Sequence, residues 1–233
     1  MKLPEPLIEG KLIERYKRFL ADIELSDGTC VTAHCPNPGS MKGLAEPGNL
    51  TLLSNSHNTK RKLPLTWELV RVNSGWVGVN TLNPNRLIYE ALLTKQIPEL
   101  AGYQKIKKEA TWSPGCRFDF LLTNGADQCF VEVKNVTLAE KDVALFPDAV
   151  TERGTKHLRH LMDVVRHGHQ AVMLFLVSRG DCGYFRPAET IDPRYAKTLL
   201  EASQNGVEIL VYRARIEPPE IYLDSRLDYC IIS

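Results

Sequence analysis

The chain has 233 residues, of which 43% are hydrophobic and 24% are charged, a composition that can bury a substantial core and excludes a disordered or collagen-like chain. Its formal net charge is +1, which excludes a broadly basic surface but leaves room for a local basic groove. The longest strongly apolar run, residues 171–177, is far shorter than the ~20 residues of a membrane-spanning helix. Pro4, Glu5 and Pro6 stand where a signal peptide would be apolar. We therefore expect a cytoplasmic protein without a membrane partner.

Short strand-like segments separated by turn residues occupy the first third of the chain. They cover residues 12–14, 19–25, 30–34, 50–54 and 67–72. This spacing predicts a small β-barrel, and five-stranded barrels of the OB type bind oligonucleotides through a strand face and its neighbouring loops. Two polar stretches, 36–43 and 55–62, interrupt the strands. Surface loops are the ordinary interpretation of both.

The pattern changes near Asn80 from short strands to longer helix and strand units. We therefore predict an OB-like barrel domain over residues 1–80 and a second domain over 81–233. The second domain is predicted to contain, in order, a helix at 84–96, strands at 107–112, 117–122 and 129–134, a helix at 155–166, a strand at 170–177, a helix from 193 to about 205 and a strand at 208–214. This order predicts an α/β sandwich with a mixed sheet.

Three charged residues meet on one face if segments 117–122 and 129–134 pair as a hairpin. Side chains alternate across a strand, so Glu132 and Lys134 share a face. The same rule places Asp119 on one face of the predicted strand 117–122. Three apolar side chains share the other face of that strand: Phe118, Phe120 and Leu122. Charges held inside a sheet usually have one another or a metal as partners.

The spacing of these charges is typical of a nuclease site. Two carboxylates, Asp119 and Glu132, suit Mg²⁺ or Mn²⁺, with water completing the shell. Lys134 can orient or deprotonate the attacking water and stabilise the charge that develops on a phosphodiester. Asp, a short gap and then Glu-x-Lys is the pattern of the PD-(D/E)xK nuclease superfamily, whose core has the same order of elements. For an isolated motif, the alternative is an ordinary surface pair between Glu132 and Lys134.

Two predicted helices add candidate residues. Glu90, on the helix before the strands, is a candidate metal ligand through water, and a solvent-facing residue is the alternative. On the helix that follows, Arg153, Lys156, His157 and His160 form one basic stripe at helical spacing. An ordinary amphipathic helix is the alternative, but the stripe suits a phosphate backbone entering the site.

The predicted barrel carries its own candidate phosphate-binding residues. They form two short basic groups in an otherwise nearly neutral chain: Arg15, Lys17 and Arg18, and Lys60, Arg61 and Lys62. We predict that both groups contact DNA phosphates.

Over nearly its whole length the sequence resembles the sugar fermentation stimulation protein A (SfsA) family of bacteria and archaea. The resemblance rests on residues 36–41, 76–81, 84–85, 117–119, 130–138, 146–154 and 156–158. It implies an N-terminal OB-like domain, a C-terminal PD-(D/E)xK-like domain, and Asp119, Glu132 and Lys134 at the motif positions of that superfamily. It also implies sequence-nonspecific DNA binding and a role in regulating maltose and related sugar metabolism.

These observations predict a sequence-nonspecific DNA-binding protein that retains a metal-dependent phosphodiesterase site. The competing hypothesis is a binding-only regulatory protein in which the nuclease-like fold is a DNA-gripping scaffold. A third class, a small-molecule or RNA-processing enzyme on the same fold, stays open. The sequence is also compatible with a homo-oligomer.

Overall fold

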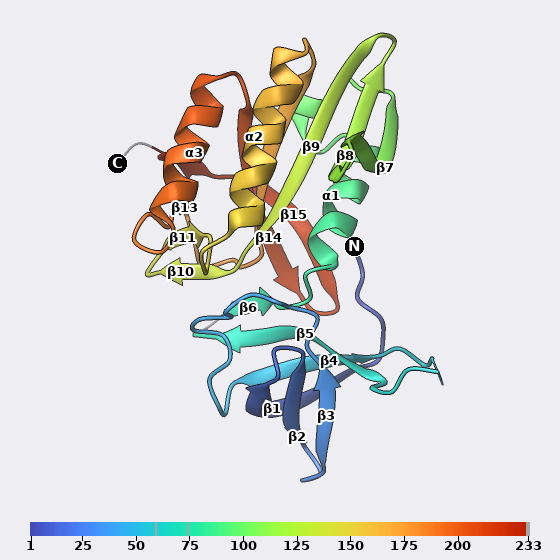
Figure 1. The fold of residues 1–233 in the computed structure, drawn as a ribbon. Coiled ribbons are helices and arrows are strands. Elements are labelled where there is room, and N and C mark those ends of the chain that lie inside the picture. Colours follow the sequence, from blue (N-terminus) through green and yellow to red (C-terminus); the bar gives the residue numbers. More distant parts are fainter. Residues whose placement is uncertain (59, 74, 232–233) are drawn as a thin grey trace.

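The computed structural model describes residues 1–58, 60–73 and 75–231, and Figure 1 shows a β-barrel joined to a larger α/β unit. The barrel strands are β1 (Leu7–Tyr16), β2 (Leu20–Leu25), β3 (Cys30–His34), β4 (Leu50–Asn55) and β5 (Leu65–Val72), followed by β6 (Gly75–Gly78). They pair in the order β3-β2-β1-β4-β5-β6, and a parallel contact between His34 of β3 and Thr66 of β5 closes the barrel. The predicted five-stranded barrel is confirmed.

Strand β1 bends and pairs with both β2 and β4, which helps the barrel to close. Its pairing with β2 shifts register between Leu12 and Glu14, as expected of a β-bulge. Gly10 lies where β1 passes very close to β2, since a Cβ there would lie 2.5 Å from Ile23 Cγ2. Trp67 and Leu53 fill the interior and are fully buried.

The larger unit is built on a six-stranded sheet. Its strand order is β15-β14-β12-β9-β8-β7, with β7 (Lys105–Ser113), β8 (Cys116–Asn124), β9 (Asp127–Val136), β12 (Gln170–Val177), β14 (Glu208–Glu217) and β15 (Glu220–Arg226). Strand β12 runs parallel to β9 and β14, whereas β8 is antiparallel to β9. The predicted mixed sheet is confirmed.

Helices cover both faces of this sheet. The helices are α1 (Asn83–Leu93), α2 (Glu152–Arg166) and α3 (Pro193–Gln204), with a short 3₁₀ turn, η1 (Pro98–Leu100). Apolar residues of α1 pack with Leu174, and those of α2 and α3 pack with Phe175 on the opposite face. The apolar run in β12 is therefore buried from both sides, as predicted. Within the described residues, no helix is long and apolar enough to cross a membrane.

A second, smaller sheet was not predicted from the sequence. It contains β10 (Leu138–Glu140), β11 (Val143–Phe146), β13 (Tyr184–Pro187) and β16 (Asp228–Tyr229), in that order. Its strands have only two to four residues, too few to show a clear alternation of polar and apolar side chains.

Strand β8 departs from the predicted alternation. Its pairing with β9 ends at Phe120 and Val131. Phe120 stacks on Tyr89 of α1, with ring centroids 6.3 Å apart. Phe118 packs instead on Phe130, at 5.8 Å, within the cluster of α2 and α3. The prediction that Phe118 and Phe120 share a face is therefore wrong, because the two strands separate between them.

The segment 36–41 is a contact between the barrel and the larger unit. The Ser40 hydroxyl donates to the Asp148 carboxylate at 3.0 Å, and the Met41 amide donates to the same group at 3.2 Å. The Thr81 hydroxyl donates to the Pro36 carbonyl at 2.6 Å. The bonds to Asp148 join the segment after β3 to the segment before α2, and the bond from Thr81 joins it to the segment before α1. This part of the predicted surface loop therefore anchors the barrel.

Candidate functional site

Asp119 lies where β8 and β9 part. Its Oδ2 accepts a hydrogen bond from the Val133 amide of β9 at 2.7 Å. The pairing of β8 with β9 has already ended at this point, so the carboxylate accepts the bond that a backbone carbonyl would accept in a paired strand. Its Oδ1 accepts from the Asn85 side-chain amide of α1 at 2.7 Å. Burial, and then the negative charge of Glu132, raise the pKa of Asp119 to about 6.

Glu132 lies in the middle of β9 and is only 4% exposed. The ammonium group of Lys134 donates to its Oε1 at 2.5 Å, and His157 Nδ1 of α2 contacts the same oxygen. Burial by itself would raise the pKa of Glu132, but His157 and Lys134 together hold it below its usual value. The predicted same-face pair is therefore a buried network that includes α2.

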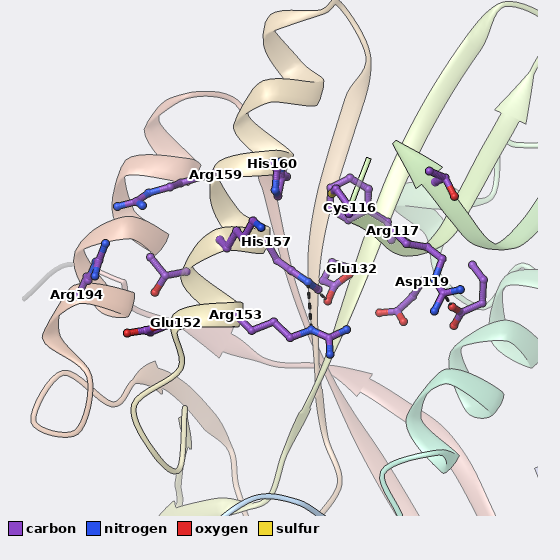
Figure 2. A pocket seen from close by; sticks show the side chains of 16 residues that line it. Cys116, Arg117, Asp119, Glu132, Glu152, Arg153, His157, Arg159, His160 and Arg194 are labelled. Carbon is purple, nitrogen blue, oxygen red and sulfur yellow. Dashed lines mark hydrogen bonds and ion pairs between the residues drawn. The ribbon is translucent and has the colours of Figure 1, made fainter. Parts of the chain in front are cut away.

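A cavity of about 1040 Å³ opens over Asp119 and Glu132. Figure 2 shows the two carboxylates on the strand side and basic side chains of α2 and α3 on the other. The basic lining residues are Arg117, Arg153, Lys156, His157, Arg159, His160 and Arg194. Within the described residues, no ion pair involves the arginines and lysine of α2 and α3 that line the cavity. Their charge is thus available to an anionic ligand.

The structure brings the predicted site residues of the larger unit together, except Glu90. Asp119, Glu132 and the basic stripe of α2 line the cavity, and Lys134 lies beside Glu132. Glu90 does not join them. Its carboxylate is half-exposed and pairs with the amino group of Met1 at 3.3 Å. Helix α1 contributes Asn85 to Asp119 in its place, because Asn85 and Glu90 point from different sides of the helix.

Three basic residues of the cavity were not predicted from the sequence. Arg159 extends the basic stripe by one further step of three after Lys156, a signal that the sequence contains. Arg117 lies on β8, shortly before Asp119 in the sequence. Arg194 lies on α3, about 40 residues after Arg153, the first residue of the stripe. No local pattern marks Arg194, since only the packing of α3 beside α2 places it at the cavity.

The predicted barrel cations lie outside this cavity. Arg15 donates to the carbonyls of Asn37 and Gly39, at 2.8 and 3.0 Å, and so supports the loop between the two units. The other predicted barrel cations lie on the β1–β2 turn and on the loop before β5: Lys17, Arg18, Lys60, Arg61 and Lys62. All of these are exposed except Arg61, which is half-buried.

The donor set for a metal consists of two carboxylates. No group of three or more His, Cys, Asp or Glu side chains arranged to hold a metal occurs among the residues that the structure describes. Asp119 and Glu132 nevertheless fit a hard divalent cation, because such an ion accepts one or two carboxylates and keeps several waters. Burial, and then the charge of Glu132, disfavour the ionised form of Asp119 and raise its pKa, and a cation would offset that cost.

Comparisons with known proteins match both units. A family model described as "SfsA N-terminal OB domain" matches residues 13–79, and one described as "Sugar fermentation stimulation protein RE domain" matches residues 82–220. A sugar fermentation stimulation protein homolog of Citrifermentans bemidjiense is 56% identical over 227 residues, which are 97% of this chain and 98% of that protein. A homolog of Geobacter sulfurreducens is 54% identical over 227 residues, 97% of each chain.

A solved structure has the same fold throughout. It is described as the structure of Pyrococcus furiosus SfsA in complex with Ca²⁺. The similarity has a TM-score of 0.89 at 25% sequence identity and covers 98% of this chain and 99% of that one.

Proposed function

The chain belongs to the sugar fermentation stimulation protein (SfsA) family, and we propose that it is a sequence-nonspecific DNA-binding protein with a metal-dependent phosphodiesterase site of the PD-(D/E)xK type. One observation carries the proposal. Two carboxylates, the half-buried Asp119 and the buried Glu132, face basic residues of α2 and α3 across one cavity. A site for a purely anionic ligand has no need of two carboxylates, because they repel phosphate.

The basic wall of the cavity supports binding to a phosphate backbone. Arg153, Lys156 and Arg159 follow one another along α2, and Arg194 lies beside them on α3. Contacts of this kind are made to phosphates and carry no base information, which is why we propose binding without sequence preference.

Asp119 and Glu132 would hold Mg²⁺ or Mn²⁺ together with water. A divalent cation at such a site supplies a more acidic water and neutralises charge on the phosphodiester. The Ca²⁺ named for the Pyrococcus furiosus structure supports a cation site in this family. Glu90, which the sequence also suggested as a ligand, pairs with the amino terminus and is not part of the proposed set.

Lys134 is the proposed catalytic cation. Its ammonium group lies 2.5 Å from Glu132 and is half-buried, so its charge acts where water is scarce. It would orient the attacking water and stabilise negative charge on the phosphate. Asn85 and the Val133 amide hold the Asp119 carboxylate in place by hydrogen bonds to its two oxygens.

The test is incubation of the purified protein with single- and double-stranded DNA and RNA in Mg²⁺, Mn²⁺ or EDTA. We expect cleavage of DNA with metal and none in EDTA. Asp119→Ala should abolish cleavage, whereas Glu201→Gln, which neutralises an exposed carboxylate on α3, should not. Absence of cleavage with every metal and substrate would overturn the phosphodiesterase assignment.

A second candidate function is DNA binding without catalysis. The observation in its favour is that Oε1 of Glu132 already contacts both Lys134 and His157. Under this alternative, wild type would bind DNA equally well in EDTA and Mg²⁺ and would cleave nothing.

The names of the relatives associate the family with sugar fermentation. We include a regulatory role in sugar metabolism, maltose among the sugars, in the proposal. Deletion of the gene should slow growth on maltose more than growth on glucose. Equal growth on both sugars would contradict this role.

A further inference from the structure

One end of the barrel gathers basic and aromatic side chains from segments that are distant in sequence. His34, the last residue of β3, pairs with Leu20 at the start of β2 and with Thr66 at the start of β5. The β1–β2 turn and the loop between β4 and β5 therefore lie at the same end. We call the side chains of Lys17, Arg18, Phe19, His34 and Arg61 the barrel-end surface.

Phe19 is an exposed aromatic ring on a firmly held backbone. It is 44% exposed, although most large apolar side chains of the chain are buried. Its amide donates to the Lys17 carbonyl at 2.7 Å, and its own carbonyl accepts from the Cys35 amide at 2.8 Å. The backbone that carries the ring is therefore already ordered, so binding a ligand costs less conformational entropy here than it would in a mobile loop.

Exposed cations precede Phe19 in the chain, and two further groups, His34 and Arg61, lie at the same end of the barrel. Lys17 and Arg18 precede it with left-handed backbones and exposed side chains. The guanidinium of Arg61 donates to the Thr66 hydroxyl at 3.2 Å and lies 3.5 Å from His34 Nδ1. In the described part of the chain, no ion pair involves Lys17, Arg18 or Arg61. An exposed ring beside uncompensated cations is complementary to nucleobases and phosphates.

The barrel-end surface lies toward the second unit. The chain leaves His34 directly into the segment 36–41, and Ser40 there donates to Asp148, just before α2. In Figure 1 the β1–β2 turn points toward the larger unit. A strand held on this surface is therefore on the side of the barrel that faces the domain with the proposed phosphodiesterase site.

We propose that the barrel-end surface binds single-stranded nucleic acid, with a base stacked on Phe19 and phosphates on Lys17, Arg18 and Arg61. The inference deepens the proposed function, on which it rests, by naming the form of nucleic acid that the barrel receives. A single strand is favoured because its base faces are free, whereas a duplex hides them within the stack and offers mainly phosphates to these cations.

The test measures binding in EDTA, where a metal-dependent cleavage reaction is absent. The probes are a fluorescent oligo-dT and a duplex of the same length, read by fluorescence anisotropy with the full-length protein. Stacking of one base implies that Phe19→Ala weakens oligo-dT binding by about 5- to 150-fold and changes duplex binding by less than about twofold. Phe19→Trp should restore oligo-dT binding, because it restores an aromatic face.

Leu93→Ala is the matched control, since Leu93 is an exposed apolar residue at the end of α1, outside the barrel. It should bind both probes like wild type. Equal oligo-dT binding by wild type and Phe19→Ala would overturn the inference, as would a loss of binding that is equal for oligo-dT and duplex. Metal-dependent cleavage by wild type is measured separately, so a protein that binds oligo-dT through Phe19 without cleaving DNA would refute only the phosphodiesterase assignment.

Discussion

Replacing Asp119 by asparagine should stabilise the metal-free protein at neutral pH. In wild type, burial and the neighbouring Glu132 raise the pKa of Asp119 from 3.8 to about 6. The folded state therefore favours the neutral carboxyl. The stability that this preference contributes is complete below pH 3.8 and is lost as the pH rises through about 6.

The magnitude follows from the size of that shift. A pKa increase from 3.8 to about 6 corresponds to roughly 3 kcal/mol of stability lost above pH 6. Asparagine is neutral at every pH and avoids this loss. It has one acceptor oxygen for two donors, the Val133 amide and Asn85, and losing one hydrogen bond costs about 1 kcal/mol. We therefore expect Asp119→Asn to be more stable by about 2 kcal/mol at pH 8.

Urea denaturation in EDTA at pH 4 and pH 8 measures this difference. The advantage of Asp119→Asn should vanish near pH 4, where the wild-type carboxyl is largely protonated. Saturating Mg²⁺ should then stabilise wild type more than the variant, because a ligand stabilises only the form that binds it. A variant that is less stable than wild type at pH 8, or whose advantage is the same at both pH values, would refute the reasoning.

Three further substitutions test other parts of the structure. Lys134→Ala should lower any cleavage by orders of magnitude and leave Mn²⁺ binding measurable by calorimetry, because Asp119 and Glu132 remain in place; loss of Mn²⁺ binding would contradict the assigned role. Arg194→Ala should weaken DNA binding similarly on all sequences. It should also reduce the slope of the logarithm of the binding constant against the logarithm of the salt concentration by about 0.9, measured by anisotropy over a salt series. An unchanged slope would mean that Arg194 makes no phosphate contact. The buried Glu68 carboxylate accepts hydrogen bonds from Ser54, Asn80 and Asn83 at 2.7 to 2.9 Å. Glu68→Gln should therefore lower the free energy of unfolding by about 1.5 to 3 kcal/mol. A denaturation midpoint equal to that of wild type would show that these bonds contribute little.

Local patterns in the sequence determined the helices α1, α2 and α3, most of the longer strands and the centre of the candidate site. The segment 170–177 predicts a strand covered on both faces because its seven consecutive apolar residues, 171–177, leave no solvent side, and β12 is that strand. Glu132 and Lys134 share a face because strand periodicity is a property of the backbone. The pairing of β8 with β9 follows from the turn between them, so Asp119 could also be placed nearby.

Only the tertiary structure decided which groups surround those carboxylates. Helix α1 directs Asn85 to Asp119 and Glu90 to the amino terminus, because the rotation of a packed helix depends on its whole apolar face. The separation of β8 from β9 moves Phe118 to the opposite face and leaves the Val133 amide for Asp119. His157 contacts Glu132 from 25 residues away. Contacts of this kind depend on how preformed elements pack against one another, and no periodicity within a single segment records that packing.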